Sequence, residues 1–317
     1  MSLVVAVDHR FDDLDVERSV LEPIGAELRD ARGLEREEAL AMCEDADAVL
    51  VGARFRFDAD AIARLTQCKA IVRYGIGYDK IDVDAAATAG IQVAYVPDYC
   101  IEEVADHALS MLLALNRRLV ELNGLVRDGN WGVPPGLVVR RLSSCTLGVI
   151  GFGRIGELVG RRAVAFGMRV LAHDPARPAA DIAAAGAEPA SLTELLEASD
   201  YVTLHAPPSP GGPLLGAAQL GRLKRGAALI NVGRADLIDE NALIAALHDG
   251  ALAGAALDVT AHEPLVPPHP LFEAPNVILT PHAAWYSLEA VLELREKAAQ
   301  EAARVLRGEP ARHVAAP

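Results

Sequence analysis

Short apolar runs rich in valine, isoleucine and leucine alternate along the chain with longer segments that carry apolar residues at helical spacing. This alternation is typical of parallel β-sheets whose strands are joined by helices. It predicts two α/β units in succession. The expected strands of the first unit are Leu3–Asp8, Ala48–Gly52, Lys69–Tyr74 and Ile91–Val96, and those of the second are Thr146–Ile150, Arg169–His173, Tyr201–Leu204, Ala228–Val232, Gly254–Asp258 and Val277–Thr280.

Two long helical patterns are expected to join these units. Residues Ile101–Val126 carry an apolar stripe that runs from Val104 to Leu122. Residues Leu288–Leu306 form a second, more charged helical pattern after the last expected strand. The C-terminus is therefore expected to return to the first unit.

The most informative motif directly follows the first strand of the second unit. Gly151, Gly153 and Gly156 form a Gly-x-Gly-x-x-Gly sequence, and Asp174 follows about 20 residues later. In this dinucleotide-binding fingerprint the glycines allow a tight turn, a close approach of the pyrophosphate and close packing of helix on strand. The pyrophosphate is expected to meet the positive end of a helix that begins near Arg154.

Composition and charge narrow the function further. The formal charge of −14 over 317 residues argues against a nucleic-acid partner, since phosphate backbones would be repelled. The four cysteines form no CxxC pair and have no histidine at ligand spacing, which predicts reduced thiols and no metal site. The N-terminus lacks the basic region of a signal peptide, and no apolar run is long enough to span a membrane. We therefore expect a cytoplasmic protein.

Three polar residues follow expected strands of the second unit, where parallel sheets bind ligands: Arg234, Glu263 and His282. A histidine can donate a proton to a carbonyl that accepts a hydride, and a neighbouring carboxylate can orient its ring. An arginine can hold a carboxylate through two parallel hydrogen bonds. Each of the three could instead be a surface residue or part of a structural ion pair. His205 is expected to line a cofactor loop, whereas structural or solvated roles are expected for His107, His173, His248, His262 and His269.

These motifs together resemble the D-isomer-specific 2-hydroxyacid dehydrogenase family, from about Ala70 to Arg307. The segments that carry the resemblance are Arg73–Asp79, similar to the family's substrate-carboxylate loop, Val104–His107 at the start of its linker helix, Asn231–Arg234 with its arginine, Asp258–Pro264 with its acid and Thr280–His282 with its histidine.

The resemblance implies two Rossmann/flavodoxin-like doubly wound α/β domains with an active-site cleft between them. The substrate domain would comprise residues 1–97 and 286–317, and the NAD-binding domain, residues 98–285, would mediate a homodimer. Besides the glycine fingerprint and Asp174, the residues implied to bind NAD are Arg154, Ile155, His205, Pro207, Val232, Asp258 and Ala284. Those implied to bind a small 2-oxo or 2-hydroxy acid are Arg73, Tyr74, Gly75, Ile76, Gly77 and Trp285.

The implied reaction is reversible hydride transfer between NADH and a 2-oxo acid. His282 would donate the proton, Glu263 would keep His282 protonated and oriented, and Arg234 would hold the carboxylate. The backbone N–H groups of Ile76 and Gly77 would bind the other side of that carboxylate. Asp174 predicts NAD over NADP because a carboxylate there binds ribose hydroxyls and repels a 2′-phosphate, although Arg177 nearby could neutralise that phosphate.

Finer details are similar to one branch, the C-terminal-binding proteins, which are NAD-sensing co-repressors. Residues 73–79 and 281–287 carry that similarity, while Ile76 and Val104 depart from it. A regulatory NAD-sensing protein and a phosphite dehydrogenase remain alternatives. Glu263 argues against a formate dehydrogenase, which has glutamine there. A feedback-regulated phosphoglycerate dehydrogenase is less expected, since no regulatory domain follows Pro317.

The expected substrate pocket is apolar. Trp285, Tyr74 and Ile76 would contact the side chain of the oxo acid. This predicts a preference for apolar, medium-length side chains over glyoxylate or 3-phosphohydroxypyruvate.

Overall fold

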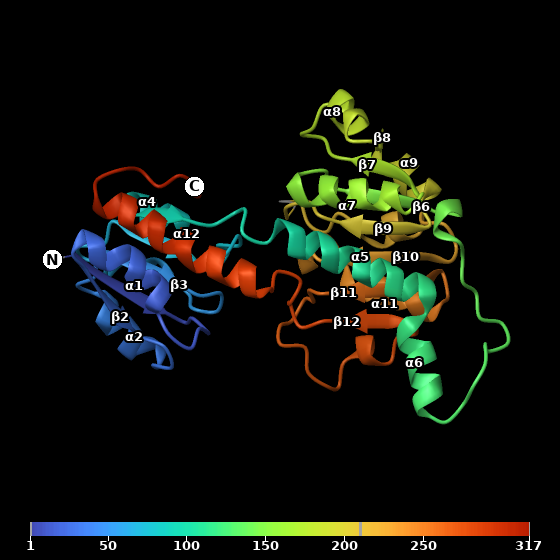
Figure 1. The fold of residues 1–317 in the computed structure, drawn as a ribbon, viewed down its shortest axis with the longest axis horizontal. Helices are drawn as coiled ribbons and strands as arrows, with labels where there is room; N and C mark the ends of the chain where they lie inside the picture. The colour runs from blue at the N-terminus through green and yellow to red at the C-terminus, as the bar shows by residue number, and fades with distance from the viewer. Residues whose placement is uncertain (1, 209–210, 317) are drawn as a thin grey trace. The chain divides into compact units, whose positions relative to one another are not determined.

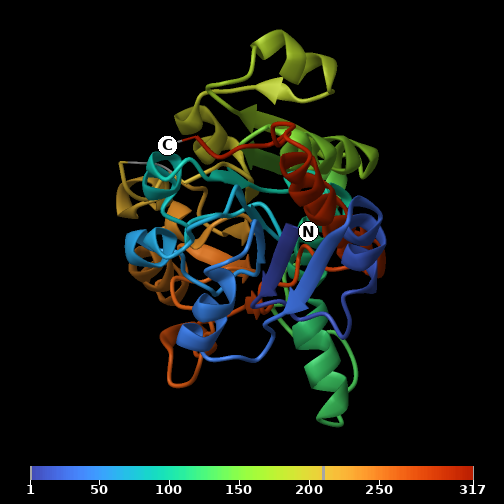
Figure 2. The same cartoon turned by 90° about the vertical axis from the view of Figure 1, so that its left-hand side faces the viewer.

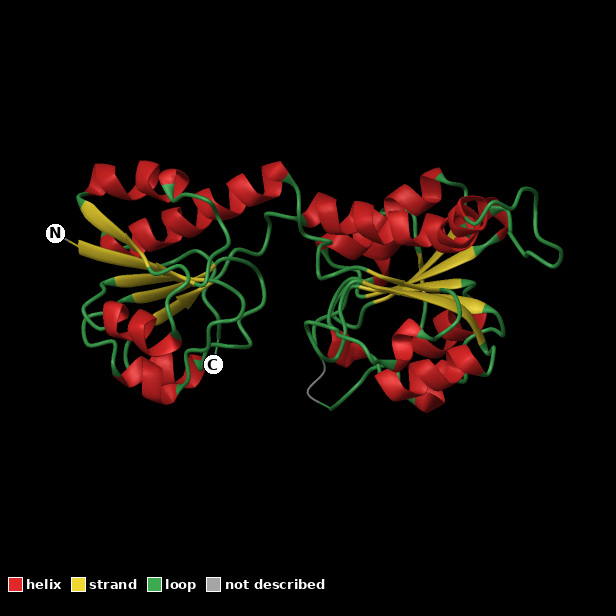
Figure 3. Ribbon diagram, turned by 90° about the horizontal axis from the view of Figure 1, so that it is seen from below, coloured by secondary structure: helices red, strands yellow, loops and turns green. Residues whose placement is uncertain are grey.

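The computed structural model describes residues 2–208 and 211–316 and confirms the α/β class (Figure 1). Contacts divide the chain into two compact units. One consists of Met1–Cys100 with Ser287–Pro317, and the other of Ile101–Tyr286. Each unit is a parallel sheet with helices on both faces, as the yellow strands and red helices of Figure 3 show.

The first unit contains a five-stranded parallel sheet in the order β2-β1-β3-β4-β5. Its strands are β1 (Ser2–Val7), β2 (Ala26–Asp30), β3 (Ala48–Val51), β4 (Ala70–Arg73) and β5 (Gln92–Ala94). Its helices are α1 (Asp15–Leu21), α2 (Arg36–Cys43), α3 (Ala59–Ala63), α4 (Val83–Thr88) and α12 (Leu288–Leu306). Because both faces are covered, every residue of β3 is buried, which explains its unbroken apolar sequence.

The second unit contains a seven-stranded parallel sheet in the order β12-β11-β10-β9-β6-β7-β8. Its strands are β6 (Thr146–Ile150), β7 (Arg169–His173), β8 (Glu188–Pro189), β9 (Tyr201–Leu204), β10 (Ala227–Asn231), β11 (Leu252–Leu257) and β12 (Val277–Leu279). Its helices are α5 (Ile101–Arg117), α6 (Leu119–Arg127), α7 (Arg154–Ala165), α8 (Ala179–Ala184), α9 (Leu192–Ala198), α10 (Ala217–Leu220) and α11 (Glu240–His248). Since all strands are parallel, their carboxyl ends lie along one edge.

The single long helix expected at Ile101–Val126 is wrong, because the chain breaks at Arg118. This residue adopts a left-handed backbone conformation, with φ 56° and ψ 37°, between α5 and α6. Its N–H donates to the carbonyl of Leu115, which tightens the last turn of α5. The apolar stripe is buried as far as Leu115, whereas α6 has no buried residue and projects from the unit (Figure 1).

A buried ion pair joins α1 to α12 in the first unit. Glu17 is fully buried, and its carboxylate accepts hydrogen bonds from Nε and Nη2 of Arg295 at 2.8–3.2 Å. The hydroxyl of Tyr74, just after β4, donates to the same carboxylate at 3.1 Å. The pair thus ties the C-terminal helix to α1, and Figure 2 shows the two helices side by side.

Replacing Arg295 by methionine should destabilise the first unit by about 3–5 kcal/mol, because Glu17 would remain buried without its cation. Hydrogen exchange of the β1 and β3 amides measures this unit separately. The control is Arg29→Met, which breaks the exposed pair between Arg29 and Glu27 in the same unit and should cost far less. Equal losses in the two variants would contradict the prediction.

Candidate active site

The glycine turn after β6 has the geometry that the fingerprint requires. Gly151 has φ 85°, and a Cβ there would lie 2.4 Å from the backbone nitrogen of Ala206. A Cβ on Gly156 would lie 2.0 Å from the carbonyl oxygen of Gly151. At Gly153, which precedes α7, a Cβ would meet nothing within 4 Å. The first and third glycines are therefore required by the fold, and the second leaves open space at a helix N-terminus, which fits the pyrophosphate of a dinucleotide.

Asp174 lies at the end of β7 and stabilises this turn. Its Oδ2 accepts the N–H of Phe152 at 2.8 Å, and its Oδ1 accepts the N–H of Ala176 at 2.9 Å. The carbonyl of Phe152 accepts a hydrogen bond from Arg177 at 2.7 Å. Phe152, between the first two glycines, is therefore held at its N–H by Asp174 and at its carbonyl by Arg177. The sequence did not indicate this structural function of Asp174.

Most residues predicted to bind the cofactor or to act on substrate lie at the same edge of the second sheet. The carboxyl end of each strand leads into one of them, because every strand pairing is parallel. In sheet order these residues are His282 and Ala284 after β12, Asp258 and Glu263 after β11, Val232 and Arg234 after β10, His205 and Pro207 after β9, Gly151 to Gly156 after β6, and Asp174 after β7. The strand order reverses at β6, which is where such sheets bind nucleotides.

His282 and Glu263 form a hydrogen-bonded pair. Nδ1 of His282 lies 2.8 Å from Oε2 of Glu263, and both side chains are close to half exposed. Nε2 of His282 meets no partner within the residues that the structure describes. The ring is therefore oriented through one nitrogen while the other can bind a ligand. The indole of Trp285 donates to the carbonyl of His282 at 2.9 Å.

The carboxylate of Asp258 anchors the turn that carries His282. It is 2% exposed and accepts the hydroxyl of Thr280 at 2.5 Å and the N–H groups of Ala283 and Ala284 at 2.8 and 2.9 Å. His107 extends the network, with Nε2 3.0 Å from the hydroxyl of Thr280. Asp258, expected to bind cofactor, thus has an internal structural function.

Arg234 follows β10 in a turn fixed by Asn231. The buried amide of Asn231 accepts the N–H of Gly233 at 3.0 Å and donates to the carbonyl of Arg234 at 2.8 Å. The guanidinium of Arg234 donates to the carbonyl of Gly233 at 3.0 Å, and its other N–H groups meet no acceptor in the described part of the chain. They remain available to an anion.

His205 cannot serve as a proton donor near neutral pH. Its Nε2 lies 2.9 Å from the hydroxyl of Thr203, and burial lowers the pKa of His205 to about 3, because the charged ring would lose its hydration. Pro207 is exposed beyond it. The cofactor loop that His205 was expected to line includes residues 209 and 210, which lie outside the described residues.

In the first unit, the Arg73–Asp79 loop is organised by its own arginine. Arg73 donates to the carbonyl of Gly77 at 2.8 Å and to that of Tyr74. The backbone N–H groups of Ile76 and Gly77 meet no acceptor among the described residues. Gly75, with φ 139°, permits this loop conformation. Two free N–H groups in sequence suit a carboxylate.

The expected apolar contact from Tyr74 is wrong. Its side chain is 5% exposed and turns toward Glu17, and burial raises its pKa well above the ordinary value. The ring packs edge-on against Phe11, with centroids 5.1 Å apart. Tyr74 therefore supports the loop from behind and offers no side-chain surface to a ligand.

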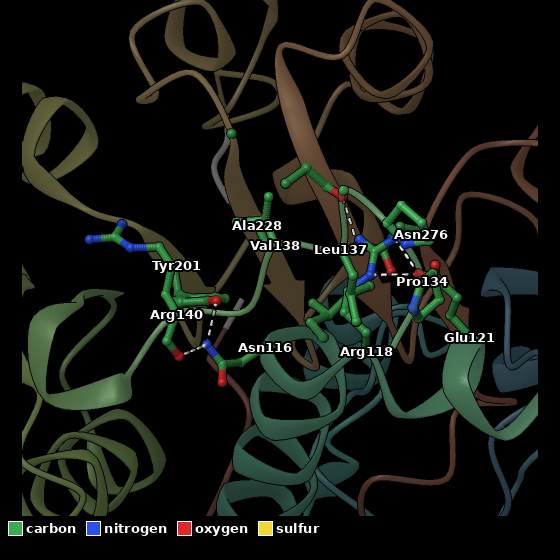
Figure 4. A pocket seen from close by; sticks show the side chains of 15 residues that line it. Asn116, Arg118, Glu121, Pro134, Leu137, Val138, Arg140, Tyr201, Ala228 and Asn276 are labelled. Atoms are coloured by element: carbon green, nitrogen blue, oxygen red, sulfur yellow. Dashed lines mark hydrogen bonds and ion pairs between the residues drawn. The ribbon is translucent and has the colours of Figure 1, made fainter. Parts of the chain in front are cut away.

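A cavity of about 420 Å³ lies at the opposite, amino edge of the second sheet (Figure 4). Tyr201, Ala228 and Asn276 line it from the strand starts. Asn116 lines it from α5, and Arg140 from the loop after α6. None of the predicted site residues borders it. The described residues contain no group of three or more His, Cys, Asp or Glu that could hold a metal ion, and no helix among them is long and apolar enough to cross a membrane.

A glycine turn at a helix N-terminus, a strand-end acid and a His–Glu pair on the same sheet edge define an NAD-dependent oxidoreductase. A family model described as D-isomer specific 2-hydroxyacid dehydrogenase, NAD binding domain, matches residues 109–284. The chain belongs to this family, and NAD is its cofactor.

Among curated relatives, a glyoxylate reductase of Korarchaeum cryptofilum is 39% identical over 270 residues, which are 84% of this chain and 81% of the relative. A D-3-phosphoglycerate dehydrogenase of Methanocaldococcus jannaschii is 37% identical over 93% of this chain, which spans only 56% of that relative. Among solved structures, a D-lactate dehydrogenase from Aquifex aeolicus, complexed with NAD and lactic acid, matches with a TM-score of 0.86 and 28% identity over 96% of each chain.

Proposed function

We propose that this protein is a D-2-hydroxyacid dehydrogenase that transfers hydride reversibly between NADH and a 2-oxo acid. The observation that carries the proposal is the arrangement of His282, whose Nδ1 contacts Glu263 while Nε2 is free. It lies on the sheet edge that also carries the glycine turn. The family and the names of its relatives support the same reaction class.

Each residue of the proposed site has a separate role in the reaction. When bound, NADH supplies the hydride. His282 donates a proton from Nε2 to the carbonyl oxygen, and Glu263 stabilises the imidazolium through Nδ1. Arg234 holds the substrate carboxylate through its unoccupied N–H groups. The free N–H groups of Ile76 and Gly77, in the first unit, are suited to bind a carboxylate as well.

The assignment of domains is part of the proposal. Residues 1–97 and 286–317 form the substrate domain, and residues 98–285 form the NAD-binding domain. The open space at Gly153 in the glycine turn of the second unit and the free N–H groups of the Arg73–Asp79 loop in the first support this assignment.

Two alternatives predict different behaviour. A regulatory NAD-sensing protein of the C-terminal-binding type would bind NADH and reduce no 2-oxo acid. A phosphite dehydrogenase would reduce NAD with phosphite. The complete set of Arg234, Glu263 and His282 favours oxo-acid reduction, because it supplies a carboxylate ligand and a proton donor together.

The experiment that tests the function is a panel of 2-oxo acids with NADH, followed at the nicotinamide absorbance. We expect turnover, with 4-methyl-2-oxopentanoate preferred over glyoxylate and 3-phosphohydroxypyruvate, because Trp285 would contact apolar side chains at about 0.8 kcal/mol per buried methylene. Trp285→Ala should weaken the long substrates and leave pyruvate nearly unaffected. The relatives named glyoxylate reductases make glyoxylate the main competitor. No turnover on any oxo acid, or turnover on phosphite alone, would exclude the proposal.

Substitutions at His282, Arg234 and Glu263 test the proposed role of each residue separately. His282→Ala should lower kcat by roughly 10²-fold or more, with NADH affinity little changed, because only the proton donor is lost. Arg234→Lys should lower kcat/KM sharply, because lysine lacks the bidentate fork. Steady-state kinetics and NADH titration measure both. Glu263→Gln tests the partner of the pair: its neutral amide stabilises the imidazolium less than the carboxylate does, so kcat should fall while NADH affinity changes little. Unchanged kcat in His282→Ala would rule out this mechanism.

The protein is further proposed to form a homodimer through its second unit. Large apolar side chains are exposed on α6 and in the segment that follows it: Leu119, Val120, Val126, Trp131, Val133 and Val138. Several large apolar side chains exposed within one segment favour a protein interface there. Sedimentation should therefore give a dimer, and Val120→Asp should dissociate it. Val164→Asp, which changes an exposed valine on α7, should leave the dimer intact. A monomeric wild type would contradict the proposal.

A further inference from the structure

Arg177 lies beside the acid that distinguishes NAD from NADP. It is three residues beyond Asp174, in the segment after β7. In dinucleotide-binding folds an acid at this position binds the ribose hydroxyls, whereas a nearby arginine accommodates a 2′-phosphate. This chain carries both residue types, so Asp174 alone does not determine the preference.

The guanidinium of Arg177 is committed to partners within the protein. Its Nη1 donates to the carbonyl of Phe152 at 2.7 Å, and its Nη2 lies 2.6 Å from Oε2 of Glu157. The guanidinium carbon lies 5.6 Å from the centroid of the Phe152 ring. The side chains of Arg177 and Glu157 are 28% and 19% exposed, so this ion pair is partly shielded from water.

Glu157 is itself held in place on the first turns of α7. Its other oxygen, Oε1, lies 2.5 Å from Nη2 of Arg161, one helical turn further on. A carboxylate near a helix N-terminus is also favoured by the helix dipole. Glu157 is therefore a fixed acceptor, and Arg177 is the partner that lies nearer to the glycine turn.

We propose that Glu157 is a specificity-determining residue that favours NAD over NADP by sequestering Arg177. A carboxylate and a phosphate compete for the same donors of a guanidinium. A 2′-phosphate could engage Arg177 only by displacing Glu157, whose largely buried carboxylate would then lose one of its two cations. Glu157 thus acts together with the negative charge of Asp174. The inference depends on NAD binding and not on which oxo acid is reduced.

The test is direct titration of NADH and NADPH by calorimetry, which needs no turnover. Glu157→Gln keeps the shape of the side chain and removes its charge. It should tighten NADPH binding by about tenfold, the gain expected when one charge-assisted hydrogen bond becomes available, and leave NADH binding within about twofold. Wild type should bind NADH more tightly than NADPH.

Two further variants make the test specific. Arg161→Gln removes the other partner of Glu157 and should leave the NADPH to NADH ratio unchanged. The double variant Glu157→Gln with Arg177→Gln should return the ratio to the wild-type value. The inference is overturned if Glu157→Gln leaves the ratio unchanged, if the gain persists in the double variant, or if Glu157→Gln abolishes NADH binding. Because titration does not measure catalysis, these outcomes are independent of the oxo-acid panel.

Discussion

Parallel pairing of every strand in the second sheet is the constraint on which the candidate site depends. It brings the segments after β6, β7, β9, β10, β11 and β12 to one edge, although Gly151 and His282 lie far apart in the sequence. Helices cover both faces of the sheet, so this edge is where loops can reach a ligand. The 420 Å³ cavity at the opposite edge shows that hollow space alone does not identify the site.

Along that edge, polar side chains that are buried or partly buried fix the conformation of the loops. Asp258 binds the turn that carries His282, Asn231 binds the turn that carries Arg234, and Asp174 binds the glycine turn. Each satisfies backbone N–H groups that would otherwise be buried without an acceptor, which is costly. These three side chains set the geometry of the site from within the protein, and the residues free to bind a ligand depend on them.

The sequence predicted the elements whose signals are local. The two-unit α/β architecture is confirmed, and the glycine turn has the geometry that its motif predicts. The edge strands β2 and β8 were missed because neither is a buried apolar run: most of β2 is polar, and β8 has two exposed residues. The break at Arg118 was missed because the apolar periodicity continues through it. The orientation of Tyr74 depends on Glu17, 57 residues away, and local pattern carries no information about such a partner.

In a protein of net charge −14, arginines that have no carboxylate partner are needed to bind anions. Arg295 is paired with Glu17, Arg177 with Glu157, and Arg73 donates to carbonyls of its own loop. Arg154, at the start of α7, is exposed and forms no hydrogen bond or ion pair with the described residues, and Arg234 uses one N–H on its neighbour's carbonyl. An acidic surface repels anions at a distance, so binding must come from cations left unneutralised at short range. Arg154 lies by the glycine turn and Arg234 one strand away from the segment that carries Glu263, so positive charge remains at the two places where a pyrophosphate and a carboxylate would need it.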